Sequence, residues 1–301
     1  MTGPRIIGPE AEASLDWLAL TRALAEGHDL PRAETKDSFL YRGDDTMLSR
    51  AAWIDGLGAL VKTAMVVPGN GARGLPAVNG AASVFSDADG TLSALIDFHL
   101  LTKWKTAGDS LLAATRLARP DSRRILIVGA GTVARSLRSA YAAAFPDAAF
   151  AVWARDAGKA RAFAEAEGAT AADDLAAAVG DADIVACATM ATDPVLRGDW
   201  LRPGTHVDLI GAYRPDMREA DDAALRRATL FVDSRETTLD HIGELKDPLA
   251  RGAIARGDVV ADYYDGGAMR RSSEAEITLF KNGGGAHLDL MTARYILDAA
   301  G

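Results

Sequence analysis

The chain contains one cysteine, Cys187, among its 301 residues. A single cysteine excludes an internal disulfide framework and favours a reducing compartment such as the cytoplasm. The sequence also lacks an apolar run of the roughly 18 residues that a membrane-spanning helix needs, and its first residues lack the pattern of a signal peptide. Because the five histidines show no metal-ligand spacing, we predict no metal site. We expect a cytoplasmic protein without a membrane partner.

Positive charge is also in short supply. The chain has 33 Lys and Arg against 42 Asp and Glu, a net charge of −9. This balance argues against binding to nucleic acid or to anionic lipid. The length suggests about two domains, each large enough to bury its own core. These features are typical of a metabolic enzyme that acts on a small molecule.

A glycine-rich turn stands near the middle of the chain. The apolar stretch at 125–128 runs into Gly129, Gly131 and Ala134, a G-x-G-x-x-A pattern that opens a helix. The first glycine permits a tight turn, and the second lets backbone approach a pyrophosphate. N–H groups at the new helix terminus then point at the phosphates. The pattern predicts a dinucleotide site with four contacting residues: Gly129, Gly131, Thr132 and Val133.

Hydrophobic patterning on either side of this turn indicates two kinds of architecture. Residues 10–27 have the apolar face of a helix, and residues 37–97 form short apolar runs broken by turn signals. We expect an antiparallel sheet there, followed by a helix at 100–117. After Gly129, strands at 149–153, 184–188, 206–210 and 230–232 alternate with helices at 157–166 and 171–178, which predicts a doubly wound parallel sheet. A strand at 277–280 and a helix from about 288 close the chain.

The end of the second strand of the parallel sheet bears on the choice of cofactor. An acid usually stands there and binds the ribose diol of NAD. This chain has Ala154 and Arg155, with Asp156 one residue later. An arginine pairs with a ribose 2′-phosphate, which favours NADP slightly over NAD. A solvated surface arginine, with Asp156 at the diol, is the alternative.

Two lysines and one cysteine lie in informative positions. The helix at 100–117 carries polar residues on one face: Thr102, Lys105, Thr106 and Asp109. That stripe suits a cleft, although a Lys105–Asp109 surface pair explains it equally well. Lys62 lies within an apolar strand, either as protection of a sheet edge or as a cleft group with a lowered pKa. Cys187 is expected to be a packed core residue.

Five stretches together resemble the ornithine cyclodeaminase/mu-crystallin family over nearly the whole chain. They are VKTAMVVPGNGARGLPAVNG (61–80), DFHLLTKWKTAG (97–108), ILIVGAGTVA (125–134), LIGAYRPDMREAD (209–221) and EITLFKNGGGAHLD (276–289). The resemblance implies an NAD(P)-binding Rossmann domain (113–287) inserted into an antiparallel-sheet α+β domain that binds substrate and forms a homodimer (1–112 plus 288–301).

The resemblance also assigns roles to matching positions. Lys62 matches the family's active-site lysine, which contacts the substrate carboxylate or the reacting nitrogen. Lys105 stands where most members have a carboxylate-binding arginine, and Thr106 matches a threonine that meets cofactor phosphate. Lysine keeps the charge but loses the planar fork of arginine, which suits an acid of different shape. Arg32 matches the family's early carboxylate-binding arginine.

Two departures from the family pattern affect the predicted reaction. Cyclodeaminases carry an aspartate after the glycine of the IG motif, whereas this chain has Tyr213. Its GAxRPDxRE motif resembles that of mu-crystallin and related ketimine reductases. Because the aspartate is missing, ornithine cyclisation lacks its expected proton acceptor. Asn282 replaces the small serine common beside the nicotinamide. We expect Tyr213 at the substrate and cofactor, and Thr189 and Asn282 at the cofactor.

The resemblance therefore implies an NAD(P)H-dependent reductase of a small α-imino acid, such as pyrroline-2-carboxylate or piperideine-2-carboxylate. Lys62 and Lys105 would hold the carboxylate, and Lys62, Asp97 or a water molecule would supply the proton. The alternatives are an amino-acid dehydrogenase, ornithine cyclodeaminase itself and a mu-crystallin-like binding protein. An imino-dicarboxylate is a further substrate hypothesis, with Lys103 or Arg73 at the second carboxylate.

Overall fold

The computed structural model describes residues 3–301, which form two compact units. Unit 1 comprises Met1–Lys105 and Gly285–Gly301, and unit 2 comprises Thr106–Gly284. The first boundary between the units falls inside helix α2 (Phe98–Leu117), between Lys105, expected at the substrate, and Thr106, expected at the cofactor. The domain boundaries expected from the sequence, after residues 112 and 287, lie a few residues further along.

Unit 1 is built on a six-stranded sheet in the order β1-β6-β5-β4-β3-β2. Only the pair β1–β6 is parallel, and the other neighbours are antiparallel, as expected for this part of the chain. β1 was not anticipated from the sequence because three residues carry too little pattern. The strands are β1 (Arg5–Ile7), β2 (Glu34–Arg42), β3 (Asp45–Ile54), β4 (Gly58–Val66), β5 (Val78–Phe85) and β6 (Leu92–Asp97).

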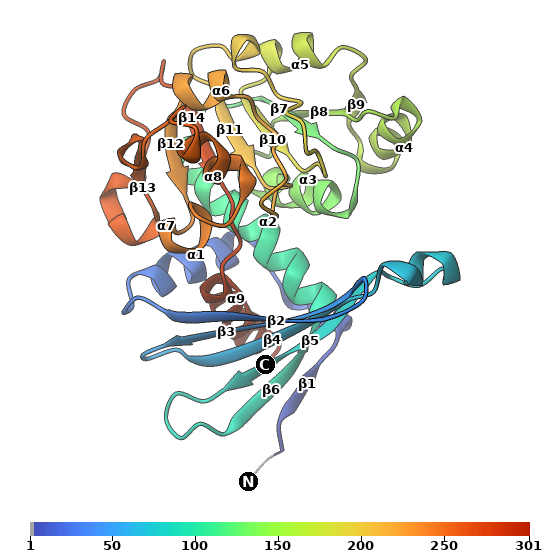
Figure 1. Cartoon of the computed structure of the whole chain (residues 1–301), viewed down its shortest axis with the longest axis vertical. Coiled ribbons are helices and arrows are strands. Elements are labelled where there is room, and N and C mark those ends of the chain that lie inside the picture. The colour runs from blue at the N-terminus through green and yellow to red at the C-terminus, as the bar shows by residue number, and fades with distance from the viewer. Residues whose placement is uncertain (1–2) are drawn as a thin grey trace. The chain divides into compact units, whose positions relative to one another are not determined.

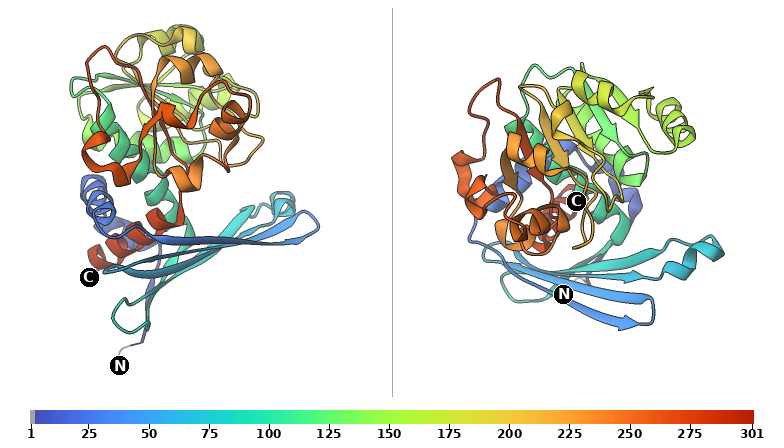
Figure 2. Two further views of the ribbon diagram at one scale, coloured as in Figure 1. Left: turned by 60° about the vertical axis from the view of Figure 1, so that its left-hand side comes forward. Right: turned by 45° about the horizontal axis from the view of Figure 1, so that its top comes forward.

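Helix α9 (Ala286–Ala299) packs on one face of this sheet, and helix α1 (Trp17–His28) packs against α9 (Figure 2). The continuous helix predicted over 10–27 is wrong in its first part, because Pro9–Ser14 forms a separate 3-10 helix. Asp16 then starts α1 by accepting a hydrogen bond from the N–H of Ala19 at 2.7 Å. α9 begins two residues earlier than expected.

The two faces of the unit 1 sheet differ in what covers them. Successive side chains of β4 alternate between faces, so that Leu60, Lys62 and Ala64 are buried on the side of α9. Strand register places the other set on the opposite, outward face. Large apolar side chains are exposed there: Ile6 (81%), Leu40 (63%), Trp53 (59%), Val61 (39%) and Met65 (38%). We call these five residues the outward apolar face.

Unit 2 is a doubly wound sheet of eight parallel strands in the order β13-β12-β14-β11-β10-β7-β8-β9. The predicted fold class is confirmed. Strand order reverses between β7 and β10, and ligands of such sheets bind at this reversal, beyond the carboxyl ends of the strands. The strands are β7 (Arg124–Val128), β8 (Ala149–Trp153), β9 (Thr170–Ala171), β10 (Ile184–Cys187), β11 (His206–Leu209), β12 (Thr229–Val232), β13 (Val259–Ala261) and β14 (Thr278–Lys281).

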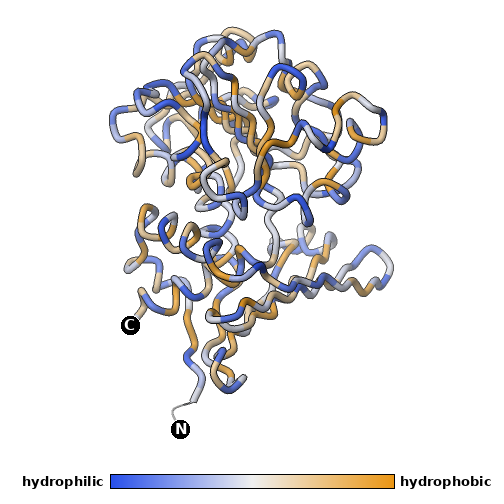
Figure 3. The backbone as a smooth tube through the Cα atoms, turned by 90° about the vertical axis from the view of Figure 1, so that its left-hand side faces the viewer, coloured by the Kyte–Doolittle hydropathy of each residue, from blue (hydrophilic) through white to orange (hydrophobic). Residues whose placement is uncertain are grey.

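Helices cover both faces of the parallel sheet (Figure 1). Its strands are among the more hydrophobic stretches of the chain (Figure 3), and Cys187 is fully buried in the core as predicted. The helix predicted at 171–178 begins later, because Asp174 caps it through the N–H groups of Ala176 and Ala177. The helices are α3 (Thr132–Ala144), α4 (Ala157–Glu167), α5 (Leu175–Asp181), α6 (Asp222–Arg227), α7 (Arg235–Thr238) and α8 (Gly243–Ala250). Within residues 3–301, none of the helices is long and apolar enough to cross a membrane.

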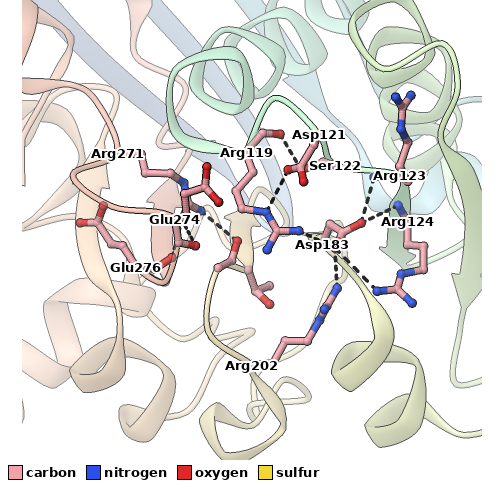
Figure 4. Close-up of polar contacts among 12 residues, drawn as sticks. Arg119, Asp121, Ser122, Arg123, Arg124, Asp183, Arg202, Arg271, Glu274 and Glu276 are labelled. Carbon is pink, nitrogen blue, oxygen red and sulfur yellow. Dashed lines mark hydrogen bonds and ion pairs between the residues drawn. The ribbon is translucent and has the colours of Figure 1, made fainter.

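A buried carboxylate joins the amino ends of the central strands (Figure 4). Asp183, directly before β10, accepts hydrogen bonds from the N–H groups of Arg123 and Arg124, both at 2.9 Å. Its other oxygen is bonded to the guanidinium groups of Arg119, at 3.0 Å, and Arg202. Burial alone would raise the pKa of Asp183, but these donors and charges hold it below its usual value.

We expect Asp183→Asn to destabilise unit 2, because the amide places N–H donors against groups that are themselves donors. The loss is about 2 kcal/mol, which corresponds to a fall in Tm of about 4–8 °C. Thermal unfolding followed by circular dichroism measures it. Asp147→Asn is the control, since the Arg123–Asp147 pair is exposed and contributes little. Equal stability of the two variants would contradict the assignment.

Candidate functional site

The glycine-rich turn after β7 has the backbone geometry that a dinucleotide site requires. Gly129 adopts a φ of +121°, and its N–H donates to the carbonyl of Trp153 at 2.7 Å. A Cβ atom on Gly129 would lie 2.5 Å from the carbonyl oxygen of Ala188, so only glycine fits. Next to it, a Cβ on Gly131 would meet no atom within 4 Å. The turn is therefore closed on its strand side and open on the other.

Helix α3 begins at this open side. Its N-cap residue is Gly131, which has no side chain to accept the N–H groups of the first turn. Thr132 and Val133 are exposed. Unsatisfied N–H groups at a helix N-terminus bind anions, helped by the helix dipole. The residues at this turn therefore fit the pyrophosphate of a dinucleotide.

The end of β8 presents an arginine and a carboxylate that caps the next helix. Ala154 is half-buried and Arg155 is exposed. Asp156 caps α4, since its Oδ1 accepts from the N–H groups of Gly158 at 2.9 Å and Lys159 at 3.2 Å. That carboxylate is therefore engaged by its own helix. Arg155 and Asp156 are both exposed, and Arg155 is the cation that directly precedes the cap of α4.

Asn282 follows β14 and has a fixed side-chain orientation. Its Nδ2 donates to the carbonyl of Thr106 at 3.1 Å and to the hydroxyl of Ser110 at 2.9 Å. A carbonyl only accepts, so the amide nitrogen must face α2 and the amide oxygen must face away from it. Ser110 lies beside Asp208, which accepts from the hydroxyl of Tyr141 at 2.7 Å. Burial raises the pKa of Asp208 to about 6.

Two loops at the strand reversal are held by one buried carboxylate, Glu219. One oxygen accepts from the N–H and hydroxyl of Thr189, after β10, at 2.7 and 2.8 Å. The other accepts from the N–H groups of Gly211 at 2.6 Å and Ala212 at 3.4 Å, after β11. Tyr213, the next residue, is 58% exposed. Thr189 and Tyr213, both expected at the cofactor, thus stand on backbone that Glu219 joins.

The surroundings of Glu219 carry charges of both signs. Glu244, from α8, accepts from the N–H groups of Glu219 and Ala220 at 2.7 and 3.0 Å. Lys281 donates 2.8 Å hydrogen bonds to the carbonyls of Leu209 and Asn282. Burial, followed by the charge of Glu244, raises the pKa of Glu219 to about 8, while Lys281 acts in the opposite direction.

Unit 1 gathers three cations around one fully buried carboxylate. Asp289, in the first turn of α9, accepts from Nζ of Lys62 at 2.8 Å. Lys105 Nζ lies 3.9 Å from the same oxygen, and Arg50 Nη1 lies 3.7 Å from the other. Lys62 also stands 4.8 Å from the ring centroid of Phe98. Strands β3 and β4, helix α2 and helix α9 each supply a charged residue.

Burial and like charges set the proton affinity of this cluster. Burial lowers the pKa of Lys62 to about 8, Lys105 and Arg50 act in the same direction, and Asp289 opposes them. For Asp289, burial would raise the pKa, but Lys105, Lys62 and Arg50 outweigh it and hold the pKa below its usual value. Lys62 can therefore change its protonation state near neutral pH.

The other unit 1 residues expected at the site lie around or outside this cluster. Arg32 is exposed. Burial, the charge of Lys105 and, to a smaller extent, the charges of Arg50 and Arg32 lower the pKa of His287 in α9 to about 3. Asp97 accepts from the N–H of Leu100 at 2.8 Å and so caps the start of α2. Among the contacts of residues 3–301 described for Asp97, none joins it to Lys62.

Sequence reasoning missed Arg50, Asp289 and Glu219. The last two lie inside quoted family stretches, AHLD and RPDMREAD, which were used as signatures without a role for their acids. Arg50 is paired directly opposite Lys62 in the sheet. Only the strand register brings these two cations together, and no local pattern reveals it.

A glycine-rich turn at the reversal of a Rossmann sheet and a buried cation cluster in unit 1 are typical of a dinucleotide-dependent enzyme that acts on carboxylic acids. Comparison with known proteins makes this class specific. Residues 52–301 match the model of the ornithine cyclodeaminase/mu-crystallin family, and the chain belongs to that family. The predicted resemblance is confirmed.

Three relatives illustrate the similarity. The Delta(1)-pyrroline-2-carboxylate reductase of Paracoccus denitrificans is 57% identical over 296 residues, covering 95% of this chain and 94% of the relative. The structure of the Thermococcus litoralis Delta(1)-pyrroline-2-carboxylate reductase with NADH and L-proline has a TM-score of 0.88 at 26% identity, covering 98% and 97%. An archaeal alanine dehydrogenase dimer with bound NAD has a TM-score of 0.89 at 26% identity, covering 99% and 96%.

These similarities bear on the predicted reaction class. The chain is an NAD(P)-dependent oxidoreductase that reduces C=N bonds of small α-imino acids, as the sequence predicted.

Proposed function

We propose that this chain reduces Δ1-pyrroline-2-carboxylate to proline. The observation that carries the proposal is the Lys62–Lys105–Arg50 cluster around Asp289, in a chain 57% identical to a reductase of this imine. Reduction adds a hydride to the imine carbon and a proton to the nitrogen. The bound nicotinamide cofactor supplies the hydride, and the chain must bind the carboxylate and deliver the proton.

Lys62 is the proposed proton donor. Its ammonium group is buried and held by Asp289 at 2.8 Å, and its pKa of about 8 lies close to neutral pH, where a general acid works best. Lys105 and Arg50 remain to hold the carboxylate. Asp97 is less suited to the proton transfer, because it caps α2.

The charge balance of the cluster favours a substrate with one carboxylate. Arg50 also pairs with Asp37 at 2.8 Å. Among the ion pairs described for residues 3–301, three cations stand against Asp37 and Asp289, an excess of one positive charge that a single carboxylate neutralises. The two residues considered for a second carboxylate have other partners, since Lys103 pairs with Glu12 and Arg73 with Asn70.

We expect NADH or NADPH to be consumed with pyrroline-2-carboxylate, measured at 340 nm. Lys62→Ala should lower kcat/KM by at least about 100-fold, as expected for loss of a general acid. Because the protonated form of Lys62 is the donor, kcat/KM of the wild type should fall as pH rises above about 8. Lys103→Ala, on the same helix as Lys105, is the matched control and should retain activity.

Lys62→Arg separates proton transfer from carboxylate binding, because arginine keeps the charge but does not release its proton. If it kept most of the activity, Lys62 would be a binding group only. Release of ammonia from ornithine in the presence of NAD, without imine reduction, would overturn the proposal and show that Tyr213 does not prevent cyclisation.

We propose further that the cofactor site accepts NADPH at least as well as NADH. Support comes from Arg155, exposed after β8, and from Asp156, whose carboxylate is already used to cap α4. A guanidinium group there suits a ribose 2′-phosphate. The relatives with bound NADH or NAD are only 26% identical, so their cofactors leave this choice open.

Arg155→Ala should lower kcat/KM for NADPH about tenfold or more, since one charge-assisted hydrogen bond is lost, and change that for NADH by less than threefold. Steady-state kinetics with each cofactor measure both values. Arg161→Ala, in α4, is the control for loss of a nearby positive charge. Equal losses with NADH and NADPH would contradict a role at the 2′-phosphate.

The outward apolar face of unit 1 is proposed as the interface of a homodimer. An archaeal relative of the same fold is a dimer, and several large apolar side chains exposed on one face are typical of protein contacts. A second copy of the chain would cover Leu40, Trp53 and Val61, which are otherwise exposed to water.

Val61→Lys should convert the dimer to a monomer, because burying an unpaired ammonium is unfavourable. Light scattering coupled to size exclusion gives the mass of each species. Glu165→Lys, on the exposed side of α4 in unit 2, controls for added charge. A wild type that is monomeric at micromolar concentration would refute the proposed interface.

A further inference from the structure

We infer that Glu219 is a positioning residue for the nicotinamide half of the cofactor. It joins the loop after β10 to the loop after β11 through four hydrogen bonds, two on each carboxylate oxygen. The inference rests on the proposed cofactor site. It gives a role to an acid outside the cation cluster of unit 1: among the contacts described for residues 3–301, none joins Glu219 to a residue of that cluster.

The position of these loops in the sheet explains which half of the cofactor they serve. A doubly wound sheet consists of two mononucleotide-binding halves on either side of the strand reversal. β7, β8 and β9 form the half that carries Gly129 and Arg155, where the adenosine diphosphate portion binds. β10, β11 and β14 form the other half, so that Thr189 and Tyr213 stand on the nicotinamide side.

The two loops also pack without space between them. A Cβ on Gly211 would lie 2.0 Å from the carbonyl oxygen of Thr189 and 2.6 Å from a carboxylate oxygen of Glu219. The backbones of the loops are therefore in direct contact, and the carboxylate closes the remaining gap. The position of one loop relative to the other therefore depends on a side chain that accepts hydrogen bonds from both loops.

A carboxyl group meets this requirement, because both of its oxygens accept hydrogen bonds. All donors to Glu219 are N–H or O–H groups, and each oxygen receives two of them. Glutamine has the same shape, but its NH₂ group would face either the N–H of Thr189 or that of Gly211. One loop would lose its acceptor and meet a donor in its place, which is costly in a buried site. Glu244 holds the backbone that carries Glu219, because it accepts from the N–H groups of residues 219 and 220. Lys281 holds the ends of β11 and β14 through the carbonyls of Leu209 and Asn282.

Glu219→Gln should weaken binding of NADH about tenfold or more, while binding of ADP-ribose, which lacks the nicotinamide, changes by less than twofold. Titration calorimetry on the full-length enzyme measures both ligands without any imino acid. A role in general stability would weaken both ligands together. The difference between them is the signature of a group that positions the nicotinamide half.

Glu276→Gln is the matched control. Glu276 also joins two segments through its carboxylate, accepting from the Thr229 hydroxyl at 2.6 Å and from the N–H of Ser272, but it does so at the amino ends of the strands. It should lower the Tm and leave the affinity for NADH within twofold of the wild type. Unchanged affinity of Glu219→Gln for NADH, or equal loss for NADH and ADP-ribose, would overturn the inference.

Hydrogen exchange on the wild type provides a test that needs no variant. The amides of Thr189 and Gly211 should be protected in the enzyme without cofactor, because Glu219 holds them before the cofactor arrives. Exchange at the rate of an unstructured peptide would overturn the inference. If the wild type bound neither NADH nor ADP-ribose, the proposed cofactor site itself would be wrong, which is a separate outcome.

Discussion

The buried charge of Asp289 is the constraint on which unit 1 depends. It lies in a helix that returns to the N-terminal sheet after the whole of unit 2, and its carboxylate is bonded to a lysine 227 positions earlier. Lys62 and Asp289 are each costly to bury alone, and together they are stable only with good geometry. The pair therefore ties the end of the chain to its beginning and sets the state of the proposed proton donor.

Unit 2 also depends on buried carboxyl groups that join separate segments. One of them lies at the carboxyl ends of the parallel strands. Parallel sheets leave loops there that share no ladder hydrogen bonds. Glu219 supplies the missing connection between two of these loops, and Asp183 performs the equivalent task at the amino ends. Glu219 accepts backbone N–H groups from two loops, whereas Asp183 accepts those of Arg123 and Arg124 and the guanidinium groups of Arg119 and Arg202. In each case several donors satisfy one buried carboxyl group.

Much of the fold follows from local pattern. The turn at Gly129 needs glycine because no side chain fits beside Ala188, and this requirement is visible in the sequence. The helix at 100–117 and the alternation of strands and helices after it were also predictable. Boundaries were less so: Asp16 and Asp174 cap their helices and start them later than apolar periodicity suggested. Capping is a single side-chain hydrogen bond, which a window over many residues does not resolve.

The sequence by itself determined the family, the glycine-rich turn, the positions of the two lysines and the presence of Tyr213 in place of the family's aspartate, since each lies in a contiguous stretch whose spacing is local. Only the tertiary structure decided that Arg50 faces Lys62 across two strands, that Asp289 lies among three cations, and that Glu219 joins two loops. Those contacts depend on strand register and on the return of α9. Register and long-range return are properties of the assembled sheets, where residues far apart in the chain become neighbours.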